Sequence, residues 1–427
     1  MNAKAGVEIA ISNESVILSV DIHTEGYAHY RLDASSDLSN WDSIASMNVL
    51  DGQGAVEVFS GGDDDLPATM FYRVIEDDSL TNVLALTETP DDYETVSWPA
   101  HLLTQEVVDS DNTPMGNPVT NEGALLGRVL FYDKKLSANY TVSCASCHQQ
   151  ENGFSDPGTF STGFDGEPTS RNSMGLANTQ FYGRGRFFWD ERAATLEDQV
   201  LEPIQNEVEM GLTLEESVER VASYRYYEDL FIDAFGDAEV TSERIALALA
   251  QFIRSIVSVQ SKYDLGEASD FSNFTDQELQ GRRLFNGRAR CATCHSGPNF
   301  VGTRIENNGL EYPYVDEGVG GVTGRDRDLG KFKMSSLRNV ERTAPYMHDG
   351  RFTTLEEVVN HYDSGVVDNP NLGLPLREDD GTVRQLNLTE AEKGALVTFL
   401  LTLTDEVVLT DSKFSDPFAE GVQSGRD

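Results

Sequence analysis

Short apolar runs separated by polar turns occupy the first 76 residues of the chain. Several runs alternate apolar and polar residues, which is the period of a strand with one buried face. Turn-forming residues, such as the Asp-Gly-Gln-Gly of residues 51–54, separate them. This spacing predicts a small all-β, sandwich-like module over residues 1–80. The predicted strands are residues 7–11, 16–22, 27–32, 55–59 and 70–75.

We predict no chemistry in this module. No cluster of cysteines or carboxylates accompanies His23 and His29, so we expect solvated strand residues rather than metal ligands. Trp41 ends a Ser-Asp-Leu-Ser-Asn-Trp stretch that resembles the turn and core tryptophan of modules appended to exported bacterial proteins. The module is expected to dock or to space the rest of the chain, with the acidic residues 81–100 as a linker.

Beyond residue 100 the apolar residues follow a helical spacing instead. Residues 121–131 show it before one cysteine pair, and residues 278–285 show it before the other. Both segments carry a glycine and then Leu-Phe, so the chain contains an internal repeat with a period of about 150 residues. We predict a mainly α fold with two tandem helical domains, residues 101–265 and 266–410, followed by a frayed tail over residues 411–427.

The net charge bears on the partners of the protein. The 427 residues include 32 Lys and Arg against 72 Asp and Glu, a formal net charge of −40. A field of this sign disfavours nucleic acid and anionic membranes, and it favours a basic partner protein. No run of about 18 apolar residues exists, so the sequence predicts no membrane span.

All four cysteines lie in two Cys-x-x-Cys-His motifs, Cys144, Cys147 and His148, and Cys291, Cys294 and His295. On one helical turn, positions i, i+3 and i+4 share a face, so two thiols can bond to a haem edge while the imidazole reaches the iron. The alternatives are a redox dithiol or half of a zinc site. A dithiol does not need the histidine, and zinc pairs usually lie closer in sequence than these two. We therefore predict two covalently bound haem c groups, one in each of two cytochrome c-like haem domains.

The haem motifs also bear on the compartment. Haem c is attached outside the cytoplasm in bacteria, and residues 1–6 lack the apolar core of a signal peptide. We therefore expect a periplasmic or otherwise exported protein from which a signal has been removed.

The stretch from Arg186 to Met210 carries the most information about function. By itself it predicts a core tryptophan, Trp189, and a helix that starts near Thr195 and is broken by Pro203. The motifs Phe-Trp-Asp-x-Arg-Ala, Leu-x-x-Gln, Pro-Ile and Glu-Met follow one another within it.

These motifs, at these spacings, resemble those of the bacterial di-haem cytochrome c peroxidases and their relative MauG. Residues 331–340 and 344–350 match the same family, and both haem motifs occur in the family's order. The resemblance covers about residues 100–405 and implies a di-haem c enzyme that reacts with hydrogen peroxide.

The resemblance also implies roles for individual residues. The haem on Cys144 and Cys147 would react with peroxide, and the haem on Cys291 and Cys294 would transfer electrons. Trp189 matches the tryptophan between the haems, where an indole shortens the tunnelling gap. The remaining matches are the distal acid–base residue Glu209, which could move a proton between the peroxide oxygens, and the pocket residues Gln199 and Pro203.

A calcium site is implied between the haem domains. Asn172 matches its side-chain ligand, and the backbone oxygens of Thr343 and Pro345 match the others. Oxygen ligands of this kind suit Ca²⁺.

The chain departs from many of these peroxidases on the distal side of the first haem. They carry a distal histidine there, whereas no histidine lies between His148 and His295, and residues 161–170 occupy the corresponding loop. We therefore expect a five-coordinate first haem that reacts with peroxide without prior reduction, as in MauG.

The sequence also contains a candidate for the sixth ligand of the second haem iron. Tyr362 stands where the peroxidases have methionine and MauG has tyrosine. Residues 355–362 follow a helical pattern, so His361 and Tyr362 would point about 100° apart and only one can face the iron. We predict Tyr362 as the ligand, with His361 or Met334 as alternatives.

Three functions remain open from the sequence. A MauG-like enzyme would oxidise a protein partner through a high-valent haem pair. A cytochrome c peroxidase would reduce peroxide to water with electrons from a small cytochrome or copper protein. A non-enzymatic electron carrier is the third, but a carrier needs neither Glu209 nor an open distal side.

Overall fold

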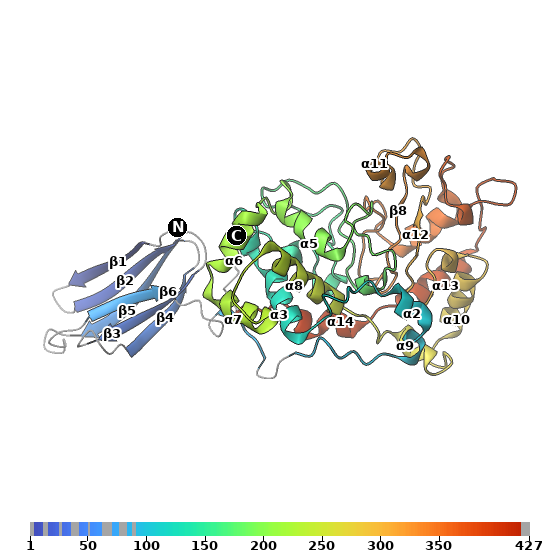
Figure 1. Ribbon diagram of the computed structural model, residues 1–427. Helices are drawn as coiled ribbons and strands as arrows, with labels where there is room; N and C mark the ends of the chain where they lie inside the picture. The colour runs from blue at the N-terminus through green and yellow to red at the C-terminus, as the bar shows by residue number, and fades with distance from the viewer. Residues whose placement is uncertain are drawn as a thin grey trace.

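The computed structural model describes residues 83–87 and 91–419, together with the backbone of six strands between residues 4 and 76 (Figure 1). The strands form two antiparallel three-stranded sheets, in the orders β1-β2-β5 and β4-β3-β6. Their bounds are β1 Lys4–Ile11, β2 Val16–Thr24, β3 Ala28–Ser35, β4 Asp42–Val49, β5 Gly52–Gly61 and β6 Phe71–Glu76.

Sequence reasoning missed one of these strands, β4. Ser43, Ser46 and Asn48 interrupt its apolar residues, so only the small alternation of Ala45, Met47 and Val49 marks it. The side chains of His23 and His29, and all of Trp41, lie outside the described residues.

The rest of the described chain is mainly helical, as expected. Most helices begin at a Thr or Ser whose hydroxyl accepts a backbone N–H, and Thr213, Thr275, Thr354 and Thr389 do so in capping boxes with a glutamate three residues later. No helix in this part of the chain is long and apolar enough to cross a membrane. The helices are α2 Gln105–Ser110, α3 Asn121–Tyr132, α4 Cys144–Cys147, α5 Leu196–Gln205, α6 Leu214–Ala222, α7 Arg225–Phe235, α8 Ser242–Ser255, α9 Lys262–Glu267, α10 Asp276–Asn286, α11 Val319–Thr323, α12 Leu355–Asn360, α13 Glu390–Leu401 and α14 Glu406–Thr410, with the short strands β7 Ile305–Glu306 and β8 Phe332–Lys333.

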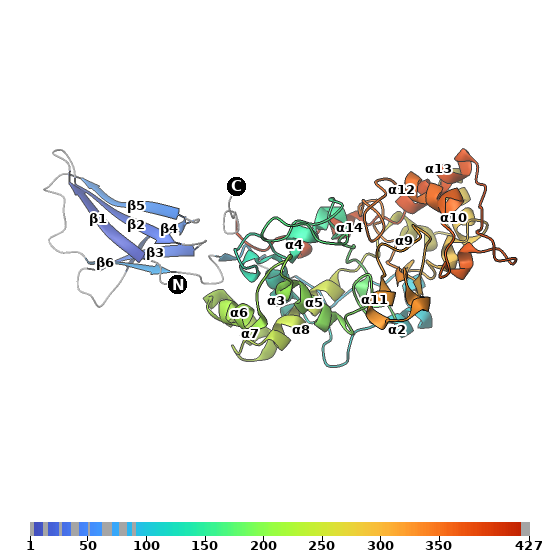
Figure 2. The same cartoon turned by 90° about the horizontal axis from the view of Figure 1, so that it is seen from above.

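The internal repeat folds into the same helix crossing twice. Helix α3 lies against α8, and α10 lies against α13 (Figures 1 and 2). A glycine stands at each crossing: a Cβ on Gly127 would lie 2.0 Å from the carbonyl oxygen of Ala248, and one on Gly281 would lie 1.9 Å from that of Ala395. No side chain fits at those distances, so glycine sets how closely each pair of helices approaches.

Two hydrophobic cores form around these crossings. The first joins α3, α5, α7 and α8 through residues such as Leu126, Phe131 and Phe252. The second joins α10, α12 and α13 through Phe285, Leu396 and Phe399. We refer to the residues around these two cores as the first and the second helical unit.

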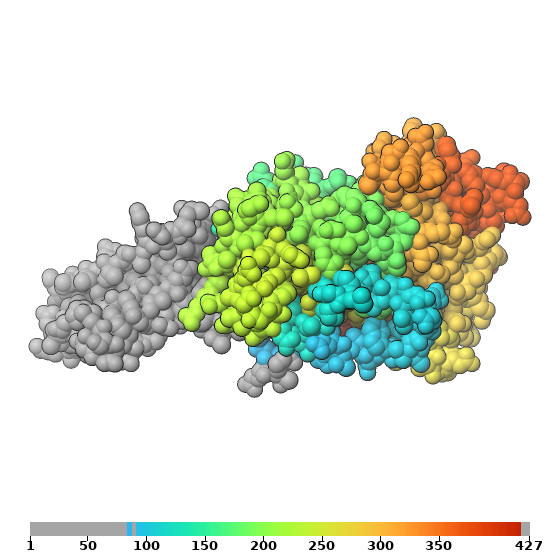
Figure 3. Space-filling model, in the orientation of Figure 1, coloured from blue at the N-terminus to red at the C-terminus, as the bar shows by residue number. Residues whose placement is uncertain are grey.

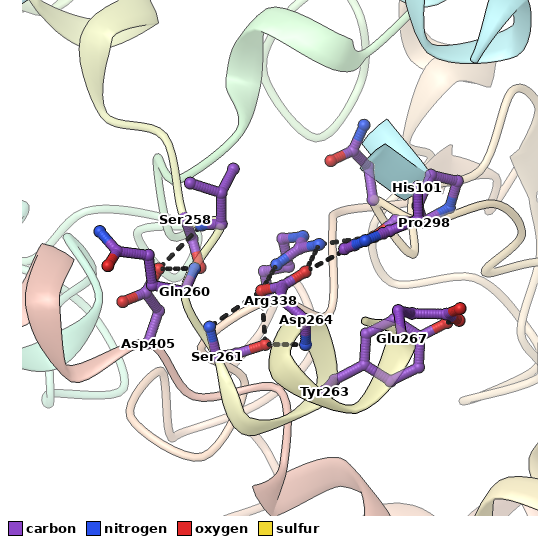
Figure 4. A network of polar contacts seen from close by, with 12 residues as sticks. His101, Ser258, Gln260, Ser261, Tyr263, Asp264, Glu267, Pro298, Arg338 and Asp405 are labelled. Atoms are coloured by element: carbon purple, nitrogen blue, oxygen red, sulfur yellow. Dashed lines mark hydrogen bonds and ion pairs between the residues drawn. The ribbon is translucent and has the colours of Figure 1, made fainter. Parts of the chain in front are cut away.

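The predicted boundary at residues 265 and 266 cuts through α9, and the structure corrects it. Tyr263, on α9, belongs to the second core. The Asp264 carboxylate accepts hydrogen bonds from Arg338 at 2.8 and 2.9 Å and from Ser261, which ties α9 to the second unit (Figure 4). The chain returns to the first unit near Asp405, whose carboxylate accepts the backbone N–H of Val259.

Residues 81–100 were predicted as a linker, but the described part of this segment packs on the helices. Tyr93 is 3% exposed and its hydroxyl donates to the carbonyl of Lys413. Trp98 packs edge-on against Phe181 at 5.6 Å. The segment continues into α2 and crosses the surface of the helical part (cyan, Figure 3). The Nε2 of His101 lies 2.8 Å from the carboxylate of Asp264 in the second unit. The sequence did not predict this packing, because the segment is acidic and only a few apolar residues anchor it.

The expectation of a frayed tail over residues 411–427 is wrong for its described part. Phe414 is 2% exposed and packs against Phe154 and Phe252 of the first core. Phe418 is also buried, in a bridge with Leu84. Aromatic burial holds this segment although it has no long helix.

Candidate functional site

The first haem motif lies on the single turn of α4. Ser143 and Ser146 form a capping box that starts this turn, which brings Cys144, Cys147 and His148 to one side. The Nδ1 of His148 lies 2.8 Å from the carbonyl oxygen of Phe154. A carbonyl can only accept, so Nδ1 carries the proton and the lone pair on Nε2 can ligate a metal. Burial lowers the pKa of His148, which keeps the imidazole neutral.

The second motif repeats this arrangement on a 3₁₀ turn, Cys291–Thr293. The Nδ1 of His295 faces the carbonyl oxygen of Phe300 at 3.3 Å, and burial lowers the pKa of His295 to about 4. Burial raises the pKa of Cys291 to about 12 and of Cys294 to about 11. None of the four cysteines forms a disulfide, so all four are available for thioether bonds.

A large apolar cavity opens beside the second motif, and it fits a haem. Both thiols and the free face of His295 line it, and hydrocarbon side chains form most of its wall. Such a wall excludes water and suits the apolar ring of a porphyrin. The apolar lining includes Phe285, Leu337, Val340, Leu355, Val359, Leu388, Leu396 and Leu400.

Of the three candidates for the sixth ligand, Tyr362 and Met334 line this cavity and His361 does not. Tyr362 lines it, within electrostatic reach of Cys291 and Cys294. His361 does not line it, because its Nε2 donates to the carbonyl of Asn308 at 2.9 Å. Burial raises the pKa of Tyr362 to about 12, so the phenol keeps its proton unless a metal displaces it. Met334 lines the cavity as well and remains an alternative.

The backbone around Tyr362 differs from the expected helix over residues 355–362. Helix α12 ends at Asn360, and a π-helical turn, His361–Gly365, follows. Such turns occur often at functional sites, because the extra residue redirects a side chain.

Glu209 lies next to the first haem motif. Its negative charge raises the pKa of both Cys144 and Cys147, so its carboxylate lies within electrostatic reach of both thiols. Burial raises the pKa of Glu209 itself, against the opposing charge of Arg192. Glu207, two residues away, is exposed.

The loop over residues 161–170 holds Glu209 in place. The backbone N–H of Phe164 donates to the carbonyl of Glu209 at 3.0 Å. A Cβ on Gly163 would lie 1.6 Å from the carbonyl oxygen of Val208, so the loop and the segment before Glu209 are in direct backbone contact. Ser161 fixes the base of the loop through the hydroxyl of Ser173 at 2.8 Å.

Gln199 and Pro203 stand one turn apart on α5 and are half-buried. The prediction that Pro203 breaks this helix is wrong, since α5 continues to Gln205. Pro203 has no N–H to donate to the carbonyl of Gln199, and the helix continues for only two residues beyond it.

Trp189 connects the two units. Its indole Nε1 donates to the carbonyl of Asn172 at 2.8 Å, and its own carbonyl accepts the backbone N–H of Lys333 at 2.8 Å. It lines the cavity that contains His295 and packs edge-on against His348 at 6.5 Å. His348 in turn stacks on Phe332 at 3.8 Å, so it has a packing role.

The three residues expected to bind calcium line the same cavity as Trp189. The Nδ2 of Asn172 donates to the carbonyls of Gly158 and Thr159 at 3.1 and 3.2 Å. Its Oδ1, and the carbonyl oxygens of Thr343 and Pro345, accept no hydrogen bond from the described residues. No cluster of three or more histidines, cysteines or carboxylates suited to a metal exists in that part of the chain.

Sequence reasoning missed a polar cluster beside Trp189, in which three residues are buried and Arg184 is exposed. It consists of Tyr182, Arg184, Glu191 and Lys333. The only signal in the sequence was a carboxylate two residues after the tryptophan, because tertiary packing brings the others together.

Comparison with known proteins agrees with this geometry. A family model described as di-haem cytochrome c peroxidase matches residues 121–269. The methylamine utilization protein MauG of Methylorubrum extorquens is 34% identical over 306 residues, which cover 69% of this chain and 81% of that protein. The cytochrome c551 peroxidase of Nitrosomonas europaea is 36% identical over 303 residues, covering 68% and 82%.

A solved structure supports the same assignment. The crystal structure of a MauG-like protein associated with microbial copper homeostasis is 34% identical, with a TM-score of 0.66 over 76% of this chain and 99% of that chain. The chain therefore belongs to the di-haem cytochrome c peroxidase and MauG family and is a di-haem peroxidase with two haem c groups.

Proposed function

We propose that this di-haem peroxidase reacts with hydrogen peroxide and, like MauG, uses the oxidising equivalents on a partner protein. The observation that carries this proposal is Tyr362 in the cavity of the second motif. A phenolate ligand stabilises oxidised iron, whereas a thioether stabilises ferrous iron and raises the potential. A second haem ligated by Tyr362 would hold an oxidising equivalent rather than accept electrons easily from a donor.

On this proposal, Cys144, Cys147 and His148 hold the first haem, and Cys291, Cys294 and His295 hold the second. When bound, the haems supply reversible electron transfer and an iron that can bind peroxide. Glu209 would move a proton from the inner to the outer oxygen of the peroxide. Its raised pKa suits this role, because the carboxyl group can hold and release a proton nearer neutral pH. Gln199 and Pro203 would shape the pocket, and Trp189 would conduct between the haems.

The distal side of the first haem carries no histidine in this proposal. Residues 149–294 contain none, and the loop over residues 161–170 is engaged with Glu209 through its backbone. The iron would therefore be accessible to peroxide in the diferric protein.

The alternative is a cytochrome c peroxidase that takes electrons from a small cytochrome or copper protein. Met334 favours it, because this residue lines the same cavity as Tyr362 and is a possible ligand of the peroxidase type. A pure electron carrier is less favoured because it has no use for Glu209.

The partner is proposed to be a basic protein, since the chain carries a net charge of −40. Periplasmic or otherwise exported localisation follows from haem c attachment. The β-strands before residue 80 would form a sandwich-like module that docks or spaces two tandem cytochrome c-like haem domains.

We also propose a calcium ion bound by the Oδ1 of Asn172 and the carbonyl oxygens of Thr343 and Pro345. These oxygens accept no hydrogen bond from the described residues, and they belong to segments of both helical units. A bound ion would hold the units together around Trp189. Removal of calcium with a chelator should lower the melting temperature, and added calcium should restore it.

Stopped-flow optical spectroscopy of the diferric protein with peroxide tests the main proposal. We expect an immediate change in the haem spectrum, followed by oxidation of a basic partner protein. A low-spin, six-coordinate first haem that ignores peroxide until the second haem is reduced would instead return the protein to the donor-dependent peroxidases.

A further inference from the structure

A buried tyrosine beside Trp189 has its hydroxyl group on a carboxylate. Tyr182 is 1% exposed and donates to the Oε1 of Glu191, which is 3% exposed. Arg184 binds the same carboxylate through two guanidinium nitrogens, and its own side chain is 35% exposed. The phenol of Tyr182 is thus in direct contact with a proton acceptor, the Glu191 carboxylate. Arg184 lies between this carboxylate and solvent.

The backbone at Glu191 adopts an uncommon conformation. Its φ is +55°, in the left-handed region that glycine favours. A glutamate rarely adopts this conformation, which persists only where surrounding contacts hold it. The turn is therefore strained in a way that presents this carboxylate to Tyr182.

Lys333 joins this pair to Trp189 and the haem cavity. Its backbone N–H donates to the carbonyl of Trp189 at 2.8 Å, and its ammonium lies 4.4 Å from the centre of the Tyr182 ring and 5.0 Å from that of Phe187. Lys333 also lines the cavity of the second motif. One side chain thus separates the Tyr182 ring from the tryptophan segment between the haems.

The cation over the ring determines how this tyrosine could be oxidised. A positive charge on the ring would be repelled by the ammonium of Lys333. Oxidation is therefore favourable only if the phenolic proton leaves together with the electron. The hydrogen bond to Glu191 provides that exit.

We propose that Tyr182 is a redox-active residue that supplies electrons to the haem pair by way of Trp189, with Glu191 as its proton acceptor. This inference rests on the proposed function, in which hydrogen peroxide removes two electrons from the haem pair. Tyr182 gives up one electron, which refills one of the two vacancies, and its O–H proton moves to Glu191. The product is a neutral tyrosyl radical, which a donor or partner residue then reduces by one electron while the proton returns.

The experiment is freeze-quench electron paramagnetic resonance of the holoenzyme after peroxide, with and without ring-deuterated tyrosine. We expect a tyrosyl signal that narrows on deuteration, disappears in Tyr182→Phe and persists in Tyr227→Phe. Tyr227 is a matched control, because it is also buried and its hydroxyl donates to a carboxylate, Asp133, at 2.8 Å, on α7 in the first unit. The optical spectrum of the oxidised haem pair should also decay more slowly in Tyr182→Phe than in Tyr227→Phe.

Glu191→Gln supplies a second variant that keeps the side-chain shape. Loss of the basic oxygen should slow formation of the radical by about 10²-fold or more. If peroxide changes the haem spectrum but wild type gives no tyrosyl signal, or Tyr182→Phe gives the same signal, the inference is wrong and the proposed function stands. If peroxide leaves the diferric haems unchanged, the proposed function itself fails and the inference fails with it.

Discussion

The two haem motifs sit in the same helical frame and face different residues. In each unit a glycine of the helix before the motif meets a backbone carbonyl of a later helix, Gly127 at Ala248 and Gly281 at Ala395. In each, the Nδ1 of the motif histidine is held by the carbonyl of a phenylalanine that follows it. The frame and the proximal side are therefore repeated.

The other residues near the two pairs of thiols are not repeated. Glu209, a half-buried carboxylate with a raised pKa, lies near the first pair of thiols. Tyr362 and Met334 lie in the cavity of the second. On the proposed function, one haem-binding frame would serve peroxide chemistry in the first unit and electron storage in the second, depending on a residue contributed by a segment outside the repeat.

The largest effect is expected from substitution of Glu209, the residue that distinguishes the first unit. Glu209→Gln keeps the volume but removes the proton shuttle, so the rate of reaction with peroxide should fall by about 10²–10⁴-fold. Stopped-flow spectroscopy measures it. Glu207→Gln is the matched control, because that side chain is exposed two residues away and should react as wild type does. Equal rates in all three proteins would remove the proposed role of Glu209.

Each unit also contains an arginine–carboxylate pair, and the two pairs should differ in strength because they are buried to different extents. Asp264 is 2% exposed beside Arg338, whereas Glu197 is 18% exposed beside Arg254. Asp264→Asn leaves a buried guanidinium unpaired and should lower the free energy of unfolding by about 3–5 kcal/mol at pH 7. Glu197→Gln should lower it less. Urea unfolding of both variants measures the difference, and equal losses would contradict the burial argument.

The Asp264 pair should also respond to pH. Burial alone would raise the pKa of Asp264, but hydrogen bonds from Arg338, His101 and Ser261 outweigh it and hold the pKa well below its usual range. The stabilisation is therefore present above the usual value of about 3.9 and is lost as the pH falls through the lower, folded-state value. The gap between wild type and Asp264→Asn should shrink below about pH 4.

The shared frame itself can be tested at its two glycines. Gly127→Ala and Gly281→Ala each force a methyl group onto a carbonyl and should destabilise their unit by about 1–3 kcal/mol. Gly116→Ala is the control, because no atom lies within 4 Å of a Cβ there, and it should change stability by less than about 0.5 kcal/mol. Thermal unfolding measures all three. If only one of the two crossing variants is destabilised, the frames are not equivalent.

The smallest effect is expected on the spectra and the reduction potential of the second haem. Tyr362→Phe should change its optical and paramagnetic signals and raise its potential on the order of 0.1 V, within the span that axial ligands cover. Redox titration measures it. Tyr346→Phe is the control, since Tyr346 lines the same cavity but its hydroxyl donates to the carbonyl of Val340 at 3.0 Å. Unchanged spectra, or a methionine-type band at the red end in wild type, would favour Met334.

The family, the two haem motifs and the mainly helical fold were predictable because their signals are local. A Cys-x-x-Cys-His motif brings its three reactive groups together within about one turn of the chain. The repeat before Cys144 and Cys291 predicted two helical units for the same reason. The roles of Glu209, Trp189, Tyr362 and the calcium ligands stay predictions, because they depend on what these side chains meet when the haems and the ion are bound.

The tertiary structure alone decided what packs on the two units. The residues around Tyr93 and Phe414 were predicted to be a linker and a tail, because a few aromatic residues in a polar segment give no periodic pattern. In the structure, burial of these two side chains holds both segments on the first unit. The contact of Tyr182 with Glu191 and Lys333 joins segments up to about 150 residues apart and includes a glutamate in a strained turn. Sequence spacing determines which groups share one turn, whereas burial and charge pairing between distant segments exist only once the chain has folded.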